Sequence, residues 1–277
     1  MRLQTPHWTV SGAVKAGHYH LYKGANCQDA MGFYAETIGE HEFLCGVVSD
    51  GCGEGEHSEV GSQMLVSFVL SEIRRIRSNV LFTPANRQAL TDVVQQLFHS
   101  IVRFIDLHLH LSCPIETNAE IAAYVKEYWL ATLVGFIMDE KEGIVFYCGD
   151  GEFCINGVPN FIDQQNTPHY IAYACLRDPQ SVGVTPDFIP REFTIVPFDV
   201  PTTNIIRISS DGFSTKNESR FAVALEREPG LPASLWGHES GHKGEVGLKK
   251  WLNSRSDRGY FDDDCAIVVA ERVLAND

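Results

Sequence analysis

The chain has 277 residues, of which 44% are hydrophobic, and its formal net charge is -14. This length and composition predict a folded core, and no stretch reaches the roughly 18 uninterrupted apolar residues of a membrane span. The negative charge argues against nucleic acid and anionic membrane surfaces as partners, because both are negatively charged themselves. The first residues lack the basic start and apolar run of a secretory signal, so we expect a cytoplasmic protein.

The cysteines predict no disulfide framework and no zinc site. There are eight of them, none arranged as CxxC. Most lie in or beside apolar stretches, where a reduced thiol behaves as a small core residue.

The first part of the chain changes from strand patterns to helix patterns. Runs rich in β-branched and aromatic residues predict three strands, at residues 8–14, 29–37 and 42–50. From Glu56 to Ile76 apolar residues recur every three or four positions, which predicts a helix. A second long helix is expected over residues 83–111, with Thr83 as its cap and Pro84 in its first turn.

The remainder alternates between strands and shorter helices. Strands are predicted at 129–139, 143–157, 191–198, 204–211 and 265–273, and helices at 118–128, 218–228 and 244–255. Residues 157–192 show no clear period and predict an irregular flap over the surface. No linker divides the chain, so we expect one α+β domain over residues 1–277 in which helices cover antiparallel sheets.

Acidic residues stand at the ends of several predicted strands. Asp50, Asp150 and Asp211 each end an apolar run and precede a glycine, and residues 262–264 are three aspartates just before the last strand. A carboxylate at a strand end is held rigidly, and a following glycine leaves its backbone open to an ion. Carboxylates gathered from separate strands suit hard divalent cations such as Mg²⁺ or Mn²⁺.

An alternative reading treats each Asp-Gly pair as a hairpin turn. It applies best to Asp150, which lies between two strand-like runs. It applies less well to Asp50 and Asp211, which lead into helical patterns, and residues 262–264 could form a solvated acidic turn. The metal reading is favoured because all four acidic groups lie at strand ends.

The order of these motifs resembles that of the metal-dependent type-2C Ser/Thr protein phosphatases across nearly the whole chain. The pieces are, in order, "NCQDA", "VVSDGCGEG", "ATLVGF", "YCGDG", "RISSDGF" and "DDDCAIVV". Each is weak alone, and their shared order makes the resemblance specific. It implies a four-layer α-β-β-α sandwich with two central antiparallel sheets and a two-metal centre at one end.

The resemblance also implies roles for individual residues. Asp50 would bridge two Mn²⁺ or Mg²⁺ ions, with the carbonyl of Gly51 beside it. Asp211 and Asp263 would complete the first metal and, with Asp50, form the catalytic carboxylates.

The remaining metal positions follow in the same way. Asp150 and Asp211 would hold a third, looser ion. Gln28 and Asp29 match the Glu-Asp pair that holds the waters of the second metal, and Asp264 occupies the neighbouring polar place.

The implied reaction is hydrolysis of phosphoserine or phosphothreonine in a protein. A water activated by two metals would attack phosphorus directly, without a phospho-enzyme. A phosphorylated protein is therefore the expected substrate, and the resemblance is also compatible with a partner kinase.

Four positions depart from the family pattern. Gly24 replaces an arginine that grips the substrate phosphate, Cys52 replaces a histidine, Gln28 replaces the glutamate of the pair, and Ala266 replaces a threonine. Gln28 brings no negative charge, so the second metal should bind more weakly.

Two nearby residues are candidates for binding the substrate phosphate. They are His20 and Lys23, chosen because they precede Gln28 closely in the sequence. The alternative reading makes His18 and His20 ordinary polar residues of a first hairpin.

Two other functions stay open at this point. The missing arginine favours a weak or inactive pseudophosphatase that serves as a binding or sensing module, whereas the retained Asp50, Asp211 and Asp263 argue for an enzyme. A two-metal nuclease would fit the carboxylates but conflicts with the negative charge.

Overall fold

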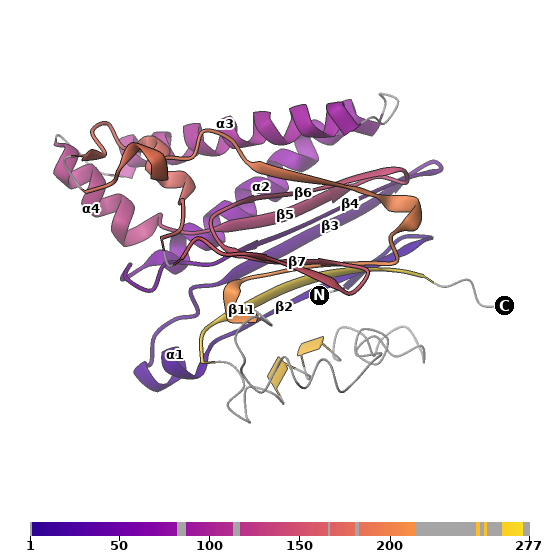
Figure 1. The fold of residues 1–277 in the computed structure, drawn as a ribbon, viewed down its shortest axis with the longest axis horizontal. Helices are drawn as coiled ribbons and strands as arrows, with labels where there is room; N and C mark the ends of the chain where they lie inside the picture. Colours follow the sequence, from indigo (N-terminus) through magenta and orange to yellow (C-terminus); the bar gives the residue numbers. More distant parts are fainter. Residues whose placement is uncertain are drawn as a thin grey trace.

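The structure is a computed structural model that describes residues 2–81, 87–112, 117–165, 167–180, 183–213, 248–249, 252–253 and 262–273. Two antiparallel sheets lie face to face at its centre (Figure 1). The six-stranded sheet has the order β1 (Arg2–Gln4), β2 (Trp8–Lys15), β11 (Cys265–Arg272), β10 (Ile205–Ser209), β7 (Gly151–Ile155), β8 (Val158–Ile162). The five-stranded sheet has the order β3 (Ala30–Ile38), β4 (His41–Ser49), β5 (Leu133–Met138), β6 (Glu142–Cys148), β9 (Thr194–Asp199).

Two helices, α2 (Ser58–Leu81) and α3 (Arg87–Ser112), cover the outer face of the five-stranded sheet, and α4 (Asn118–Tyr128) packs against α2 at one end of this layer (Figure 1). The start of α4 is fixed by a capping box, in which the Thr117 hydroxyl accepts from the Glu120 N–H at 3.2 Å and the Glu120 carboxylate accepts from the Thr117 N–H at 2.9 Å. The fourth helix, α1 (His18–Lys23), joins the two sheets, and single 3-10 turns lie at Ile171–Cys175, Pro186–Phe188, Val200–Thr202 and Asp211–Phe213.

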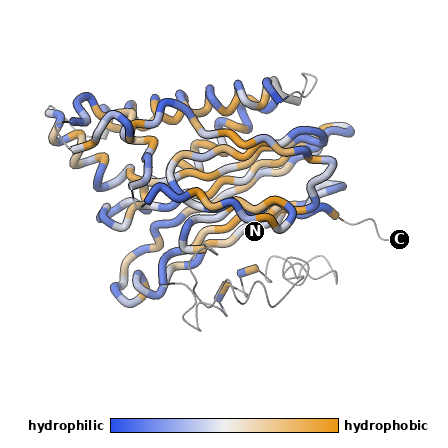
Figure 2. Tube along the Cα trace, in the orientation of Figure 1, coloured by the Kyte–Doolittle hydropathy of each residue, from blue (hydrophilic) through white to orange (hydrophobic). Residues whose placement is uncertain are grey.

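Strand β4 is buried on both faces, because its alternate residues enter two different apolar clusters. Phe43 and Cys45 pack beneath the helices with Leu65 of α2, whereas Leu44 and Val48 pack between the sheets. A strand covered on both sides needs apolar residues on both, so it shows as a nearly continuous apolar run at the centre of Figure 2. This double burial gives the strand a rigid end at Ser49, next to Asp50.

The predicted α+β sandwich, with two central antiparallel sheets flanked by helices, is confirmed. On the outer face of the six-stranded sheet, Leu248 and Leu252 are buried in a third cluster with Cys265, Ile267 and Val269. Most of the two helices predicted at 218–228 and 244–255, and the predicted cap at Thr83 and Pro84, lie outside the described residues.

Two alternative readings were wrong. The runs 144–149 and 152–157 do not form a hairpin, because β6 pairs with β5 and β9 in one sheet while β7 pairs with β10 and β8 in the other. Residues 18–23 form a helix and not a hairpin, because the chain here passes from β2 in one sheet to β3 in the other.

The stretch 157–192 is more ordered than its sequence indicates. It begins with β8, which pairs with β7 along its length, and continues to a 3-10 turn in which Ile171 and Ala172 are fully buried under the helices. The reading of residues 1–277 as one domain with a flap at 157–192 stays a prediction. In the described part of the chain, no helix combines the length and apolar character needed to cross a membrane.

Candidate metal centre

A cavity of about 490 Å³ opens at the end of the sandwich where strands of both sheets terminate. Its described lining comes from widely separated parts of the chain: Tyr19, His20, Gln28, Asp50, Gly51, Cys52, Gly53, Thr132, Asp150, Pro168, Tyr170, Asp211, Asp262 and Asp263. Most of the predicted site residues belong to this set, and the three exceptions are Asp29, Asp264 and Lys23.

Asp50 is fixed at the end of β4 by the residues that precede β5. The Thr132 N–H donates to the Asp50 carbonyl at 2.8 Å, and the Asp50 N–H donates to Thr132 Oγ1 at 3.2 Å. Gly51 forms a bridge with Ala131 and donates its N–H to the Gln28 carbonyl at 3.2 Å. A β-carbon on Gly51 would lie 2.8 Å from that carbonyl, so the close approach requires glycine.

Asp150 lies where the chain crosses from the five-stranded to the six-stranded sheet. Gly149 and Gly151 flank it with φ angles of +95° and +143°, a region that side chains disfavour. A β-carbon on Gly151 would also lie 2.9 Å from the Ser209 carbonyl of β10. The hairpin reading of Asp150 is therefore wrong, and the crossover brings its carboxylate to the cavity.

The turn before β11 meets the end of β10 at very short range. Asp211 follows β10, and a β-carbon on Gly212 would lie 1.8 Å from the Asp264 carbonyl. Asp263 Oδ1 accepts from the Asp264 N–H at 2.8 Å. A β-carbon on Gly17 would lie 2.2 Å from the Asp263 carbonyl carbon, so α1 begins directly against this turn.

Asp29 and Gln28 supply two buried oxygens that lack a hydrogen-bond donor. Asp29 is 3% exposed, and its Oδ2 accepts from Ser210 Oγ at 2.6 Å, whereas its Oδ1 has no partner. Gln28 donates Nε2 to the Gly55 carbonyl at 3.0 Å, and its Oε1 has no partner. Leaving two buried acceptors without donors is costly unless something else satisfies them.

Burial and crowding raise the pKa of several of these carboxyl groups. Burial, reinforced by the charges of Asp29 and Asp211, holds the pKa of Asp50 well above its usual value. Burial raises the pKa of Asp29 to about 7 and, with the Asp211 charge, raises that of Asp150 to about 6. The pKa of Asp263 is raised by the same two causes. The site therefore resists holding its negative charges without a compensating cation.

The donor set fits hard divalent cations. Five carboxylates line the cavity, and His20 is the one side chain among the described lining residues that can carry a positive charge. Mg²⁺ and Mn²⁺ prefer oxygen ligands, and a cation at this point would also satisfy the free oxygens of Gln28 and Asp29.

His20 is brought to the cavity by Asp264. Its side chain is mostly buried, and Nδ1 lies 2.8 Å from Asp264 Oδ2, a contact that is an ion pair when the imidazole is protonated. Asp264 also accepts from the N–H groups of Gly17 at 2.7 Å and Gln28 at 2.5 Å. Lys23 does not line the cavity; its ammonium lies 4.1 Å from the ring centroid of Tyr19.

Sequence reasoning missed three contributors to this site. Ser210 binds the Asp29 carboxylate and also accepts from the Ala266 N–H at 2.9 Å. Thr132 fixes the backbone of Asp50, and Tyr170 closes one wall of the cavity. Ser210 directly precedes Asp211 in the sequence, and this adjacency to a predicted ligand was the one available signal.

Comparison with known proteins decides the family. A family model described as "Protein phosphatase 2C" matches residues 16–253. The chain belongs to the protein phosphatase 2C family. No curated protein sequence matches it significantly.

Solved structures of this phosphatase family share the fold. A serine-threonine phosphatase 2C from Toxoplasma gondii has a TM-score of 0.57 at 12% identity, covering 98% of this chain and 97% of its own. A bacterial serine phosphatase has a TM-score of 0.55 at 13% identity, covering 97% and 98%. The catalytic domain of the serine threonine protein phosphatase PstP, solved with two manganese ions, has a TM-score of 0.52 at 14% identity, covering 97% and 99%.

Gly24, matched by sequence to an arginine position of the family, has a structural role in this protein phosphatase 2C. Gly24 ends α1 with a φ of +66° and donates its N–H back to the helix carbonyl of Leu21 at 3.3 Å. Glycine takes this left-handed conformation without strain, whereas a side chain disfavours it. Gly24 therefore serves as a helix cap.

Proposed function

We propose that this protein phosphatase 2C is an active, Mn²⁺- or Mg²⁺-dependent enzyme that hydrolyses phosphoserine and phosphothreonine in proteins. The observation that best supports it is the convergence of Asp50, Asp211 and Asp263 on one cavity from three separate strand ends. A carboxylate cluster whose burial opposes its own ionisation is well suited to a cation and poorly suited to anything else.

Each acidic residue has a place in this proposal. Asp50, with the Gly51 carbonyl, would contact two ions, and Asp211 and Asp263 would complete the first. Asp150 and Asp211 would hold a third ion. When bound, the metals supply an activated water for in-line attack on phosphorus and neutralise the phosphoryl oxygens.

Buried hydrogen bonds orient Asp29 and Gln28 beside the proposed centre. Ser210 donates to Asp29 and keeps one carboxylate oxygen in place, which leaves Oδ1 free for a metal-bound water. Gln28 would face the second ion with its uncharged Oε1. This ion should therefore bind more weakly than it would beside a glutamate at position 28.

His20 is the proposed anchor for the substrate phosphate. Its imidazole lines the cavity beside the Asp264 carboxylate, and a ring N–H would donate a hydrogen bond to a phosphate oxygen. Lys23 is proposed for a more distant contact on the rim, because its ammonium lies over the ring of Tyr19, which lines the cavity, while Lys23 itself does not.

A pseudophosphatase that binds phosphoproteins without turnover is the second candidate. It is favoured by one specific observation, the replacement of the family's arginine by the helix cap at Gly24. In either case we place the protein in the cytoplasm, in signalling opposite a kinase that phosphorylates the same substrate. The seven cysteines in the described part of the chain are free thiols, which suits a reducing compartment.

The test is hydrolysis of an aryl phosphate and of a phosphothreonine peptide, with and without Mn²⁺, by the full chain and by Asp50→Ala. Metal-dependent turnover that is lost in Asp50→Ala is the expected result. A folded protein that is silent under every condition, yet still binds the phosphopeptide, would replace the enzyme with the pseudophosphatase.

A further inference from the structure

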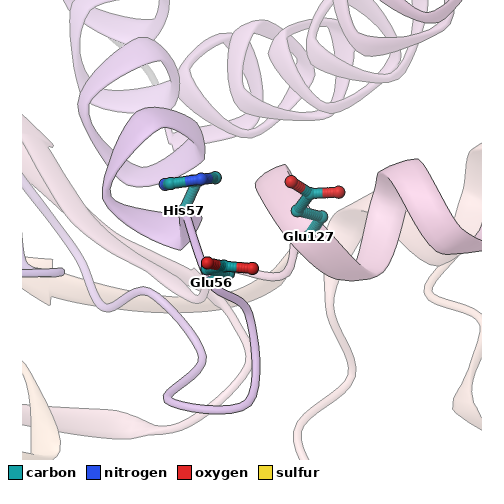
Figure 3. A group of neighbouring side chains, drawn as sticks. All are labelled: Glu56, His57 and Glu127. Carbon is teal, nitrogen blue, oxygen red and sulfur yellow. The ribbon is translucent and has the colours of Figure 1, made fainter.

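A second group of metal-ligating side chains lies outside the cavity: Glu56, His57 and Glu127 (Figure 3). One ligand atom from each lies within 4.8 Å of the other two, and none of the three residues lines the cavity. Glu56 and His57 belong to the loop between Asp50 and α2, and Glu127 belongs to the last turn of α4. Figure 3 shows the three side chains facing a common space between the loop and the end of the helix.

Backbone contacts hold these two segments together. The His57 N–H donates to the Glu127 carbonyl at 3.1 Å. Gly55 lets the loop approach α4 closely, since a β-carbon there would lie 2.8 Å from the Lys126 carbonyl. The His57 ring is stacked on the Tyr128 ring, with centroids 5.5 Å apart and planes at 19°. The imidazole is therefore oriented by packing, which reduces the entropy lost when it binds an ion.

The charges around His57 are unbalanced. Glu59 Oε1 lies 3.8 Å from His57 Nδ1, in addition to the carboxylates of Glu56 and Glu127. The nearby Lys126 is paired with Glu54 at 3.1 Å. Within the described residues, no lysine or arginine forms an ion pair with Glu56 or Glu127, so a cation bound here would relieve repulsion between carboxylates.

We propose that Glu56, His57 and Glu127 bind a zinc ion, separate from the Mn²⁺ or Mg²⁺ centre. One imidazole nitrogen and two carboxylates are a ligand set that zinc uses, with water in the fourth position. A nitrogen ligand also favours zinc over manganese, whereas the all-oxygen cavity favours the harder ions. This site does not depend on the proposed phosphatase activity.

The position of the site gives the ion a structural consequence. The loop that it would clamp to α4 begins with Gly51, Cys52 and Gly53, which form one wall of the cavity. Cys52 already donates its N–H to the Leu130 carbonyl just beyond α4, at 2.8 Å. Zinc would add a link at the far end of the same loop and hold that wall in place.

The test counts bound zinc in the full chain, in an Asp50→Ala background that weakens the central site. Equilibrium dialysis against buffered free zinc is followed by elemental analysis, for this parent and for His57→Gln, Glu127→Gln and Glu54→Gln made in it. Glu54→Gln is the matched control, because it removes a charge from the same loop outside the trio. Circular dichroism shows that each variant is folded.

We expect His57→Gln and Glu127→Gln each to weaken the binding of one zinc equivalent by about 10-fold or more. Glu54→Gln should bind this zinc as tightly as the parent does. X-ray absorption at the zinc edge should show nitrogen and oxygen neighbours at about 2.0–2.1 Å. Unchanged zinc binding in both trio variants would overturn the proposal. Sulfur neighbours at about 2.3 Å would also overturn it, because they would place zinc on a cysteine.

Discussion

The metal-free protein should lose stability as the pH rises from about 5 to about 8. Burial raises the folded-state pKa of Asp29 from 3.8 to about 7, and that of Asp150 to about 6, and it raises the pKa of Asp50 as well. A raised carboxyl pKa means that the folded state favours the protonated form. The destabilisation is therefore absent below the unfolded pKa, grows as the pH rises, and is complete above the folded pKa.

Asp29 alone sets the scale of this effect. Its side chain is 3% exposed, so solvent screens it little. A shift of about three pKa units at ~1.4 kcal/mol per unit gives about 4 kcal/mol, an upper figure because the neighbouring carboxyls share protons. Over the pH range in which the folded state holds one more proton than the unfolded state, the free energy of unfolding falls by about 1.4 kcal/mol per pH unit.

Urea unfolding of chelator-treated protein, at about one-unit steps from pH 5 to pH 8, measures this slope. Asp29→Asn is the matched control, because it keeps an acceptor for Ser210 and removes the titrating group. The free energy of unfolding of this variant should fall less steeply with pH than that of the unsubstituted protein. Added Mg²⁺ should reverse the trend, since ions bind the deprotonated carboxylates. A metal-free stability that is level or rises with pH would refute the reasoning, and equal slopes in the two proteins would assign the effect to other groups.

Three further changes test the geometry of the site. Gln28→Glu restores a carboxylate and should tighten Mn²⁺ binding about 10-fold in calorimetry, and unchanged affinity would show that Gln28 does not face the ion. Gly17→Ala forces a β-carbon against the Asp263 backbone and should cost roughly 1–3 kcal/mol in urea unfolding, whereas Gly53→Ala, whose β-carbon would have no neighbour closer than 3.9 Å, should cost much less. His20→Gln should raise the KM for a phosphopeptide about 10-fold with a smaller change in kcat, and identical constants would remove His20 from substrate binding.

Much of the fold could be predicted because the periodicity is local. The apolar spacing of α2 follows from burial of one helix face, and the apolar and aromatic composition of β3 follows from its place in the sheet. Each can be read within a short window of sequence. The strand-end positions of Asp50 and Asp211 could be predicted for the same reason, since the apolar run and the following glycine are adjacent in the sequence.

The partition of strands between the sheets could not be predicted in this way. β6 and β7 are separated by only a few residues, yet they pair with strands far away in the chain, at β9 and β10. A hairpin and a crossover differ in these distant partners and hardly differ in local composition. The hydrogen bonds of Asp264 could not be predicted for a related reason. They reach Gly17 and Gln28, which are 247 and 236 residues away in the sequence.

Helix α1 accounts for both the glycine at position 24 and the burial of His20. Gly24 ends the helix in a left-handed conformation, which a glycine adopts more readily than an arginine would. The same helix begins against Asp263 and turns His20 toward Asp264. The proposed phosphate anchor is thus a short side chain whose position is fixed by packing. A single imidazole offers fewer hydrogen bonds to a phosphate than the planar fork of an arginine does. Phosphate binding in this protein should therefore depend on the metal ions more strongly than in relatives that keep the arginine.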